Sequence, residues 1–180
     1  WNIWYKEDIR NVLQLLKEVD ADVVCLQELT INHPHFNLDI DTPRFVAEGL
    51  GFEHFFKEAD REFSDGKERM YGKGIFSRSP ITRAVSAYIQ EPPTSPAPEG
   101  DYSNEARVYA EVTVNTSFGE FTIGTTHMSY TDAFTPTPAK EKETDKLVSI
   151  IREKKERYIL TGDLNSLPGS YTINEISQCL

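Results

Sequence analysis

The sequence predicts an α/β fold with mixed β-sheets. A strand, a helix and a second strand are expected within the first 28 residues, alternating β-rich segments fill the middle of the chain, and two helices that open with Thr-Pro lie between strands. Strands with helices at intervals are typical of layered α/β proteins. A chain of 180 residues suffices for one domain with a sizeable core. We therefore expect residues 1–180 to form a single domain.

The first third of the chain alternates strand and helix. Apolar residues recur at helical spacing over 7–19, with Asp8 near the start where it suits the helix dipole. A continuous apolar strand over 23–27 is expected to end at Glu28. Thr42 is the expected N-cap of the next helix, with proline at its first position and Gly51 at its end. Residues 1–4 look like the end of another strand.

The remainder of the chain is richer in strands. A turn at Asp65-Gly66 and a proline-rich loop over 91–104 separate them. The helix that follows Thr137 is expected to turn Leu147 and its apolar neighbours inward and its Lys and Glu residues outward. The expected strands cover 53–58, 73–78, 83–90, 106–114, 120–126 and 158–161, and a last helix is expected over 171–180.

Composition narrows the classes of function. A net charge of −10 argues against a broad basic surface for non-specific nucleic-acid binding. No apolar run approaches the length of a membrane span. Cys25 and Cys179 suggest neither a disulfide framework nor a metal site, which favours a reducing compartment such as the cytoplasm. The chain starts at Trp1 without a methionine, so targeting stays open, as does the oligomeric state.

A carboxylate and an amide follow the last apolar run. Gly162 permits a turn or a close approach to a ligand, and Asp163 and Asn165 come directly after it. Residues i and i+2 of a strand point the same way, so these two side chains are expected to face one pocket. Such a pair suits the binding of water and phosphate, although Asp and Asn are also common in turns.

Three other expected strand ends carry a polar residue: Asn2, Glu28 and His127. Ligand sites of layered α/β folds form where loops leave strand ends. Each residue alone also has an ordinary role, as a solvated carboxylate for Glu28 and a structural imidazole for His127. Arg107 also suits a surface ion pair, and Glu68 also suits a solvated charge in a polar loop. The other histidines, His33, His35 and His54, match no ligand pattern.

The order of these residues resembles that of a known family. The matching pieces are Asn2-Ile3-Trp4, Asp22-Val23-Val24-Cys25-Leu26-Gln27-Glu28, Gly74-Ile75-Phe76-Ser77-Arg78-Ser79-Pro80-Ile81, Thr126-His127-Met128 and Gly162-Asp163-Leu164-Asn165. The chain is similar to the endonuclease/exonuclease/phosphatase superfamily of metal-dependent phosphoesterases, which includes deoxyribonuclease I. The resemblance implies a sandwich of two mixed β-sheets flanked by helices, with the active site at one edge.

The resemblance also implies a metal and phosphate site. Glu28 matches the principal ligand of Mg²⁺, with Mn²⁺ as the alternative ion, and Asn2 lies beside the metal and the phosphate. Asp163 matches the carboxylate that orients the attacking water. Asn165 matches the amide that holds the phosphate.

Three further residues match with defined roles. His127 resembles a histidine that hydrogen-bonds the scissile phosphate or protonates the leaving group. Arg107 resembles a phosphate-contacting arginine of the deoxyribonuclease I branch. Glu68 resembles the glutamate of that branch that pairs with the histidine.

The implied function is Mg²⁺-dependent hydrolysis of a phosphodiester by in-line attack of water. Nucleic acid, a phospholipid headgroup and a small phosphoester, including a phosphomonoester, all remain open as substrates. The alternative is a non-catalytic binding module that keeps the fold.

The chain departs from the family pattern in two places. Lys73 stands where many members have asparagine, before the Ile-Phe-Ser-Arg strand. The family's later Asp and its terminal Asp-His pair, which activates the water, have no counterpart before Leu180. We therefore expect 1–180 to be the N-terminal two-thirds of a longer protein, and inactive or very weak by itself.

Overall fold

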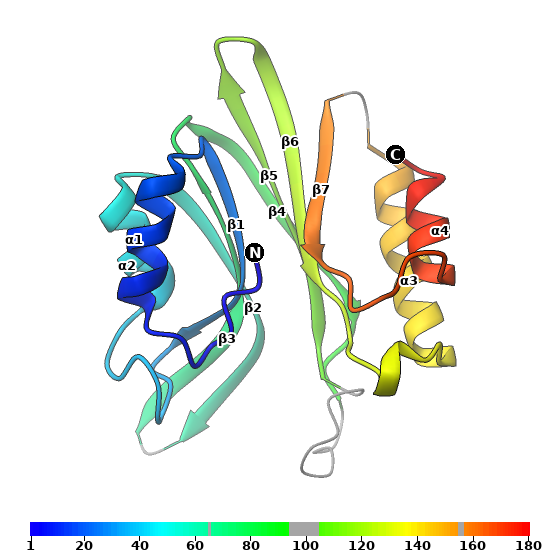
Figure 1. Cartoon of the computed structure of the whole chain (residues 1–180), viewed down its shortest axis with the longest axis horizontal. Helices are drawn as coiled ribbons and strands as arrows, with labels where there is room; N and C mark the ends of the chain where they lie inside the picture. Colours follow the sequence, from blue (N-terminus) through cyan, green and yellow to red (C-terminus); the bar gives the residue numbers. More distant parts are fainter. Residues whose placement is uncertain (65, 94–104, 155–156) are drawn as a thin grey trace.

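The computed structural model describes residues 1–64, 66–93, 105–154 and 157–180. They form four layers, with two β-sheets packed face to face and helices over both outer faces (Figure 1). Helices α1 (Ile9–Val19) and α2 (Thr42–Leu50) cover the first sheet, and α3 (Pro138–Arg152) and α4 (Tyr171–Ser177) cover the second. The predicted sandwich of two sheets flanked by helices is confirmed.

The first sheet contains three antiparallel strands in the order β1 (Val23–Ile31), β3 (Lys67–Ser77) and β2 (Glu53–Ser64). A parallel bridge between Asn2 and Gln27 attaches the N-terminal segment to its edge. The N-terminal segment therefore lies along the open side of β1.

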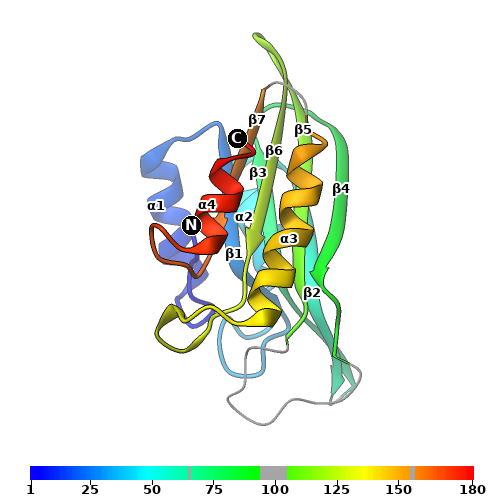
Figure 2. The ribbon, with the colours of Figure 1, turned by 90° about the vertical axis from the view of Figure 1, so that its right-hand side faces the viewer.

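The second sheet has the order β4-β5-β6-β7. Its strands are β4 (Ile81–Gln90), β5 (Arg107–Thr116), β6 (Gly119–His127) and β7 (Tyr158–Asp163). The β6–β7 pair is parallel, and α3 lies in the connection between these two strands (Figure 2). Because parallel strands end at the same edge of a sheet, β6 and β7 bring His127 and Asp163 into register.

Several element boundaries differ from expectation. Strand β1 does not end at Glu28 but continues to Ile31 through a β-bulge. The side chain that caps α2 belongs to Asp41, because the Thr42 hydroxyl instead donates to the carbonyl of Thr30 at 2.8 Å. The predicted turn residue Asp65 and most of the proline-rich loop, 94–104, lie outside the described residues.

Apolar side chains fill each of the three spaces between layers. Alternation along β1 turns Val24 and Leu26 toward α1 and α2, and Cys25 toward the second sheet. The apolar contact between the two sheets consists of Cys25, Ile75, Val112, Val114 and Ile123, with partly buried neighbours. None of the helices in the described ranges has the length and apolar composition that crossing a membrane requires.

Candidate active site

A cleft of about 640 Å³ opens where β6 and β7 end beside the N-terminal segment. It receives side chains from both sheets and from the loops that follow them. Six of the seven residues expected at the site line it: Asn2, Glu28, Arg107, His127, Asp163 and Asn165.

The β-bulge aims Glu28 into the cleft. Gln27 pairs with Lys73 and Leu29 with Gly72, which leaves Glu28 between them without a partner on β3. Its φ of 64° lies in the left-handed region, which is unusual for a residue other than glycine. The carboxylate accepts hydrogen bonds from Asn2 Nδ2 at 2.8 Å and from the backbone N–H of Tyr5 at 3.0 Å. The N-terminal segment thus fixes the direction of Glu28.

Asn2 joins the two carboxylates of the cleft. Its Nδ2 donates to Glu28 and also to Asp163 Oδ2, at 3.1 Å, across 161 positions of sequence. Its Oδ1 accepts from the backbone N–H of Trp4 at 3.0 Å. In Figure 1 the end of β7 lies next to the N-terminus, as this bridge requires.

Gly162 allows β7 to come close to β6 directly before Asp163. Its φ is 143°, and a Cβ at this position would lie 2.3 Å from the carbonyl oxygen of Thr126. A side chain would therefore collide with backbone, which does not yield easily. The glycine is required for the placement of Asp163 opposite His127.

Asp163 and Asn165 face the same cleft, but through a turn and not through a strand. Strand β7 ends at Asp163, whose Oδ1 accepts from the backbone N–H of Asn165 at 3.0 Å. Asn165 has a φ of 45° and donates from Nδ2 to the carbonyl of Met128 at 2.9 Å. The same nitrogen lies 3.2 Å from His127 Nε2. The amide therefore links the loops after β6 and β7.

The imidazole of His127 is held in its neutral form. Burial, together with the positive charges of Arg107 and Lys73, lowers its pKa to about 4, against an opposing effect of Asp163. Because Asn165 Nδ2 donates, His127 Nε2 acts as the acceptor and the ring proton belongs on Nδ1. An anion bound nearby would raise this pKa, since it would favour the charged ring.

Arg107 lies at the base of the cleft, with 8% of its surface exposed. It forms an ion pair with Glu105 at 2.9 Å, and its Nε donates to Ser129 Oγ at 3.3 Å. Lys73, to which the sequence assigns no role, lines the same cleft. The basic groups therefore occupy the side of the cleft formed by β3 and β5.

Glu68 is not brought to the cleft. It lies on β3 near the turn of the β2–β3 hairpin, where Arg61 Nη1 donates to its carboxylate at 2.7 Å. The hairpin register places these two residues on adjacent strands, so the arginine is its natural ion-pair partner. Glu68 is therefore paired with Arg61, and its pairing with His127 stays a prediction.

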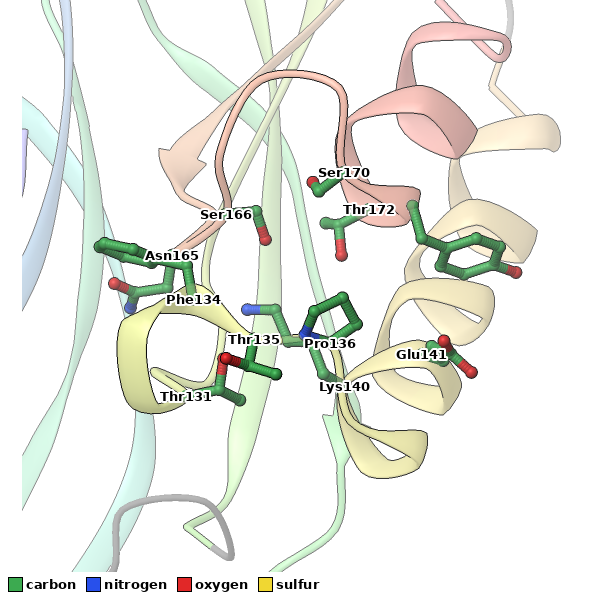
Figure 3. Close-up of a pocket in the computed structure, with 11 residues that line it drawn as sticks. Thr131, Phe134, Thr135, Pro136, Lys140, Glu141, Asn165, Ser166, Ser170 and Thr172 are labelled. Carbon is green, nitrogen blue, oxygen red and sulfur yellow. The ribbon is translucent and has the colours of Figure 1, made fainter.

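A buried ionic cluster beneath the cleft was missed at the level of sequence. Lys140 Nζ on α3 donates to the carbonyls of Ser129 and Leu164 at 2.6 and 2.8 Å, and Glu143 accepts from the backbone N–H of Ser129 at 3.1 Å. Figure 3 shows Lys140 reaching from α3 into a small pocket that Asn165 also lines. Lys140 thus ties the loop after β6 to the loop after β7.

The prediction that the Lys and Glu residues of this helix point outward is wrong for Lys140 and Glu143, which are 4% and 1% exposed. Lys140 and Glu143 lie seven and four positions before Leu147, on the same face of the helix, and that spacing is the signal that reveals their burial. Burial lowers the pKa of Lys140 to about 8 and raises the pKa of Glu143, and each partner's charge opposes its shift.

Aromatic side chains line the wall of the cleft formed by the N-terminal segment and its neighbours. The His33 ring contacts both Tyr5 and Tyr71 there. Trp4 and Tyr130 are more exposed, at the rim. The sequence shows no such patch, because these residues come from separate parts of the chain. The cleft therefore combines acids and amides with basic and aromatic groups.

The donor set of the cleft fits a hard divalent cation. Within the described ranges there is no group of three or more His, Cys, Asp or Glu side chains placed to hold a metal. Mg²⁺, however, is usually held by one or two carboxylates, with water and substrate phosphate completing its shell. The Glu28 carboxylate and the amide oxygen of Asn2, with Asp163 beside them, provide such a partial set of oxygens. These residues are compatible with Mg²⁺.

Two helix-covered sheets with acids, amides and a histidine at one edge define an α/β sandwich with an active-site cleft. The model of the Endonuclease/Exonuclease/phosphatase family matches residues 1–179, and the chain belongs to that family. A comparison with curated proteins finds no match.

Solved structures share this fold. An endonuclease/exonuclease/phosphatase from Beutenbergia cavernae aligns with a TM-score of 0.66 at 20% identity, covering 95% of this chain and 47% of the other. A mannosyl-6-phosphatase from Bacteroides thetaiotaomicron gives 0.65 at 18% identity, covering 97% and 62%. TDP2 from D. rerio, in complex with a single-strand DNA product, gives 0.66 at 18% identity, covering 98% and 62%. The chain thus spans about half to three-fifths of these proteins.

Proposed function

We propose that the protein containing this chain is a Mg²⁺-dependent phosphoesterase that hydrolyses a phosphodiester by in-line attack of water. The observation that carries this proposal is the Glu28–Asn2–Asp163 bridge, which brings two carboxylates to one amide beside His127 and Asn165. Its members come from both sheets and the N-terminal segment, and such convergence in a cleft is typical of a catalytic site.

The chain's own residues divide the work as follows. Asp163 accepts a hydrogen bond from the attacking water and aligns it with the ester bond. Asn165 donates from its amide to a phosphoryl oxygen, and Arg107 contributes positive charge at the base of the cleft. His127 is neutral in the free protein; when a bound phosphate raises its pKa, the protonated ring donates a hydrogen bond to that phosphate or a proton to the leaving group.

Glu28 and Asn2 would hold the metal ion. The Glu28 carboxylate is already directed by two hydrogen bonds, and the remaining lone pair of Asn2 Oδ1 faces no other donor among the described residues. A bound Mg²⁺, or Mn²⁺ in its place, would neutralise phosphate charge and stabilise the charge that develops in the transition state.

The activity of the 180-residue chain itself is expected to be very weak or absent. The family's water-activating Asp-His pair has no counterpart in the sequence, and solved relatives are longer. Mannosyl-6-phosphatase and DNA-bound TDP2 among the structural relatives support phosphoesters as substrates, with nucleic acid, phospholipid headgroup and small phosphoester as the classes to compare. Tests of turnover therefore use the full-length protein.

The test compares Glu28→Ala with wild type on bis(p-nitrophenyl) phosphate and Mg²⁺. We expect turnover to fall by about 10³-fold or more, because the metal loses its main ligand. Glu48→Ala, which removes a surface carboxylate paired with Arg44 on α2, is the control and should keep full activity.

A second readout does not depend on turnover. Millimolar Mg²⁺ should raise the melting temperature of wild type and leave that of Glu28→Ala unchanged, because a ligand stabilises only the state that binds it. Absence of turnover in the wild-type protein, with Mg²⁺ binding retained, would favour the non-catalytic binding module.

A further inference from the structure

The most unusual charge of the cleft belongs to Lys73. It lies on β3 with its side chain between the two sheets, only 2% exposed, and it lines the cleft. Its Nζ donates to the carbonyl of Val108 on β5 at 2.7 Å. Within the described ranges its ammonium has no other hydrogen bond and no carboxylate at ion-pair distance. A buried ammonium with a single neutral acceptor is strongly disfavoured.

Electrostatics agree with this geometry. Burial and the neighbouring charge of Arg107 lower the pKa of Lys73 to about 7, and Glu143 opposes the shift from α3. Lys73 in turn helps to lower the pKa of His127. Lys73 and Arg107 therefore lie close enough to His127 for their positive charges to act on its ring, while His127 Nε2 also lies 3.8 Å from Asp163 Oδ2 of the Glu28–Asn2–Asp163 bridge.

A structural role does not account for the charge. The Val108 carbonyl also accepts from the Thr126 hydroxyl at 3.0 Å, so it remains hydrogen-bonded without the lysine. An apolar side chain of similar length would fill the same space without burying an ammonium. The positive charge is therefore explained better by a ligand that enters the cleft.

We propose that Lys73 and Arg107 form an anion subsite that receives the second negative charge of a phosphoryl group. The inference rests on the proposed phosphoesterase function and changes its substrate class from diester to monoester, because a phosphomonoester carries two negative charges near neutral pH where a phosphodiester carries one. The extra cation makes a monoester the preferred ligand of this cleft. In its hydrolysis the water oxygen bonds to phosphorus, the P–O ester bond breaks, the alcohol takes one proton and inorganic phosphate leaves.

The subsite is tested by binding, without turnover. Sulfate and methyl sulfate are both tetrahedral anions, with two negative charges and one negative charge respectively. Both keep these charges at pH 6.5, the pH of the titration. We expect the full-length protein, with EDTA and at low salt, to bind sulfate about 10- to 100-fold more tightly than methyl sulfate, because a charge-assisted hydrogen bond is added. Nuclear magnetic resonance or calorimetric titration measures both affinities.

Three variants test whether the positive charge of Lys73 is responsible for the preference for sulfate. Lys73→Met should reduce the preference for sulfate about tenfold, and Lys73→Asn, which retains a hydrogen-bond donor, should reduce it similarly. Lys57→Met is the matched control, because Lys57 pairs with Lys73 across β2 and β3 but has its own partner in Glu58 and lies outside the cleft lining. It should retain the wild-type preference.

Two results would overturn the subsite: equal affinity of the wild-type protein for the two anions, or an unchanged preference in Lys73→Met with its fold verified.

For the intact enzyme, the same substitution should lower kcat/KM for p-nitrophenyl phosphate more than for bis(p-nitrophenyl) phosphate, and an equal loss would refute the monoester preference. A protein that selects sulfate through Lys73 but hydrolyses neither ester would refute the proposed function and leave the anion subsite standing.

Discussion

The two ends of the space between the sheets are built from the same strands but from opposite kinds of side chain. At one end Cys25 and Ile75 of the first sheet meet Val112 and Ile123 of the second. Toward the cleft, the positions that continue these inner faces carry Gln27, Lys73, Thr125, His127 and Asp163. The inner faces of β1, β3 and β6 thus change from apolar to polar along their length.

This difference separates stability from chemistry. The apolar end gains free energy from burial, which is non-directional and tolerates changes of shape. The polar end depends on individual hydrogen bonds between the sheets, from Gln27 Nε2 to Thr125 Oγ1 at 3.0 Å and from Lys73 Nζ to the carbonyl of Val108. The side-chain oxygen of Gln27, Oε1, is buried without a partner among the described residues. Polar groups in this setting are costly and need a function to explain them.

The largest effect is expected where the polar end depends on backbone contact. Gly162→Ala would place a Cβ 2.3 Å from the Thr126 oxygen at a φ of 143°, and we expect a loss of about 4 kcal/mol in the free energy of unfolding. Gly169→Ala, at a φ of 81° with nothing within 4 Å, should cost about 1 kcal/mol. Urea denaturation measures both, and equal losses would show that the close approach of β7 to β6 is unimportant.

The next effect concerns the apolar end. Ile123→Ala removes a 4%-exposed side chain and should cost about 3 kcal/mol in the free energy of unfolding while the cleft keeps its affinity for sulfate. Thr125→Val, two positions along the same face of β6, keeps the packing but loses the bond to Gln27, and should cost about 1 kcal/mol. A loss of sulfate binding in folded Ile123→Ala would contradict the independence of the two ends.

A smaller effect is expected in the pH dependence of stability, to which Lys73 at the polar end contributes. The pKa of Lys73 is about 7 in the folded protein and near its ordinary value when unfolded, so between these values the unfolded chain binds more protons. The free energy of unfolding of wild type, relative to that of Lys73→Met, should therefore rise with pH above 7, by at most about 1.4 kcal/mol per pH unit. Below pH 7 the destabilisation caused by the buried ammonium should be fully present. Urea midpoints at pH 7, 8 and 9 check the slope, and parallel curves would mean that the lysine is not deprotonated on folding.

The smallest effect concerns Gln27. Gln27→Leu removes the unpartnered oxygen together with the bond to Thr125, so the gain and the loss nearly cancel. We expect a change below about 1 kcal/mol in the free energy of unfolding by urea denaturation. A loss above about 2 kcal/mol would indicate that the amide oxygen has a water or protein partner.

Local pattern was sufficient for most elements. The periodicity of 7–19 and the apolar run at 23–27 correspond to α1 and the first part of β1, and the order of polar residues predicted six of the cleft's lining residues. Pattern failed where a tertiary contact overrides it. Glu28 ends the apolar run but not the strand, because β3 continues to pair on both sides of the bulge. The Arg61–Glu68 ion pair was not predicted, because it depends on how β2 and β3 lie side by side.

The sequence by itself determined the succession of strands and helices and the family to which their motifs belong. These properties depend on neighbouring residues and on periodicity, which a linear chain already contains. Tertiary structure decided that Asn2 lies between Glu28 and Asp163, that Lys140 and Glu143 turn inward, and that Lys73 has no carboxylate at ion-pair distance within the described ranges. The physical reason is that burial and charge pairing are properties of three-dimensional surroundings, and residues far apart in sequence supply them.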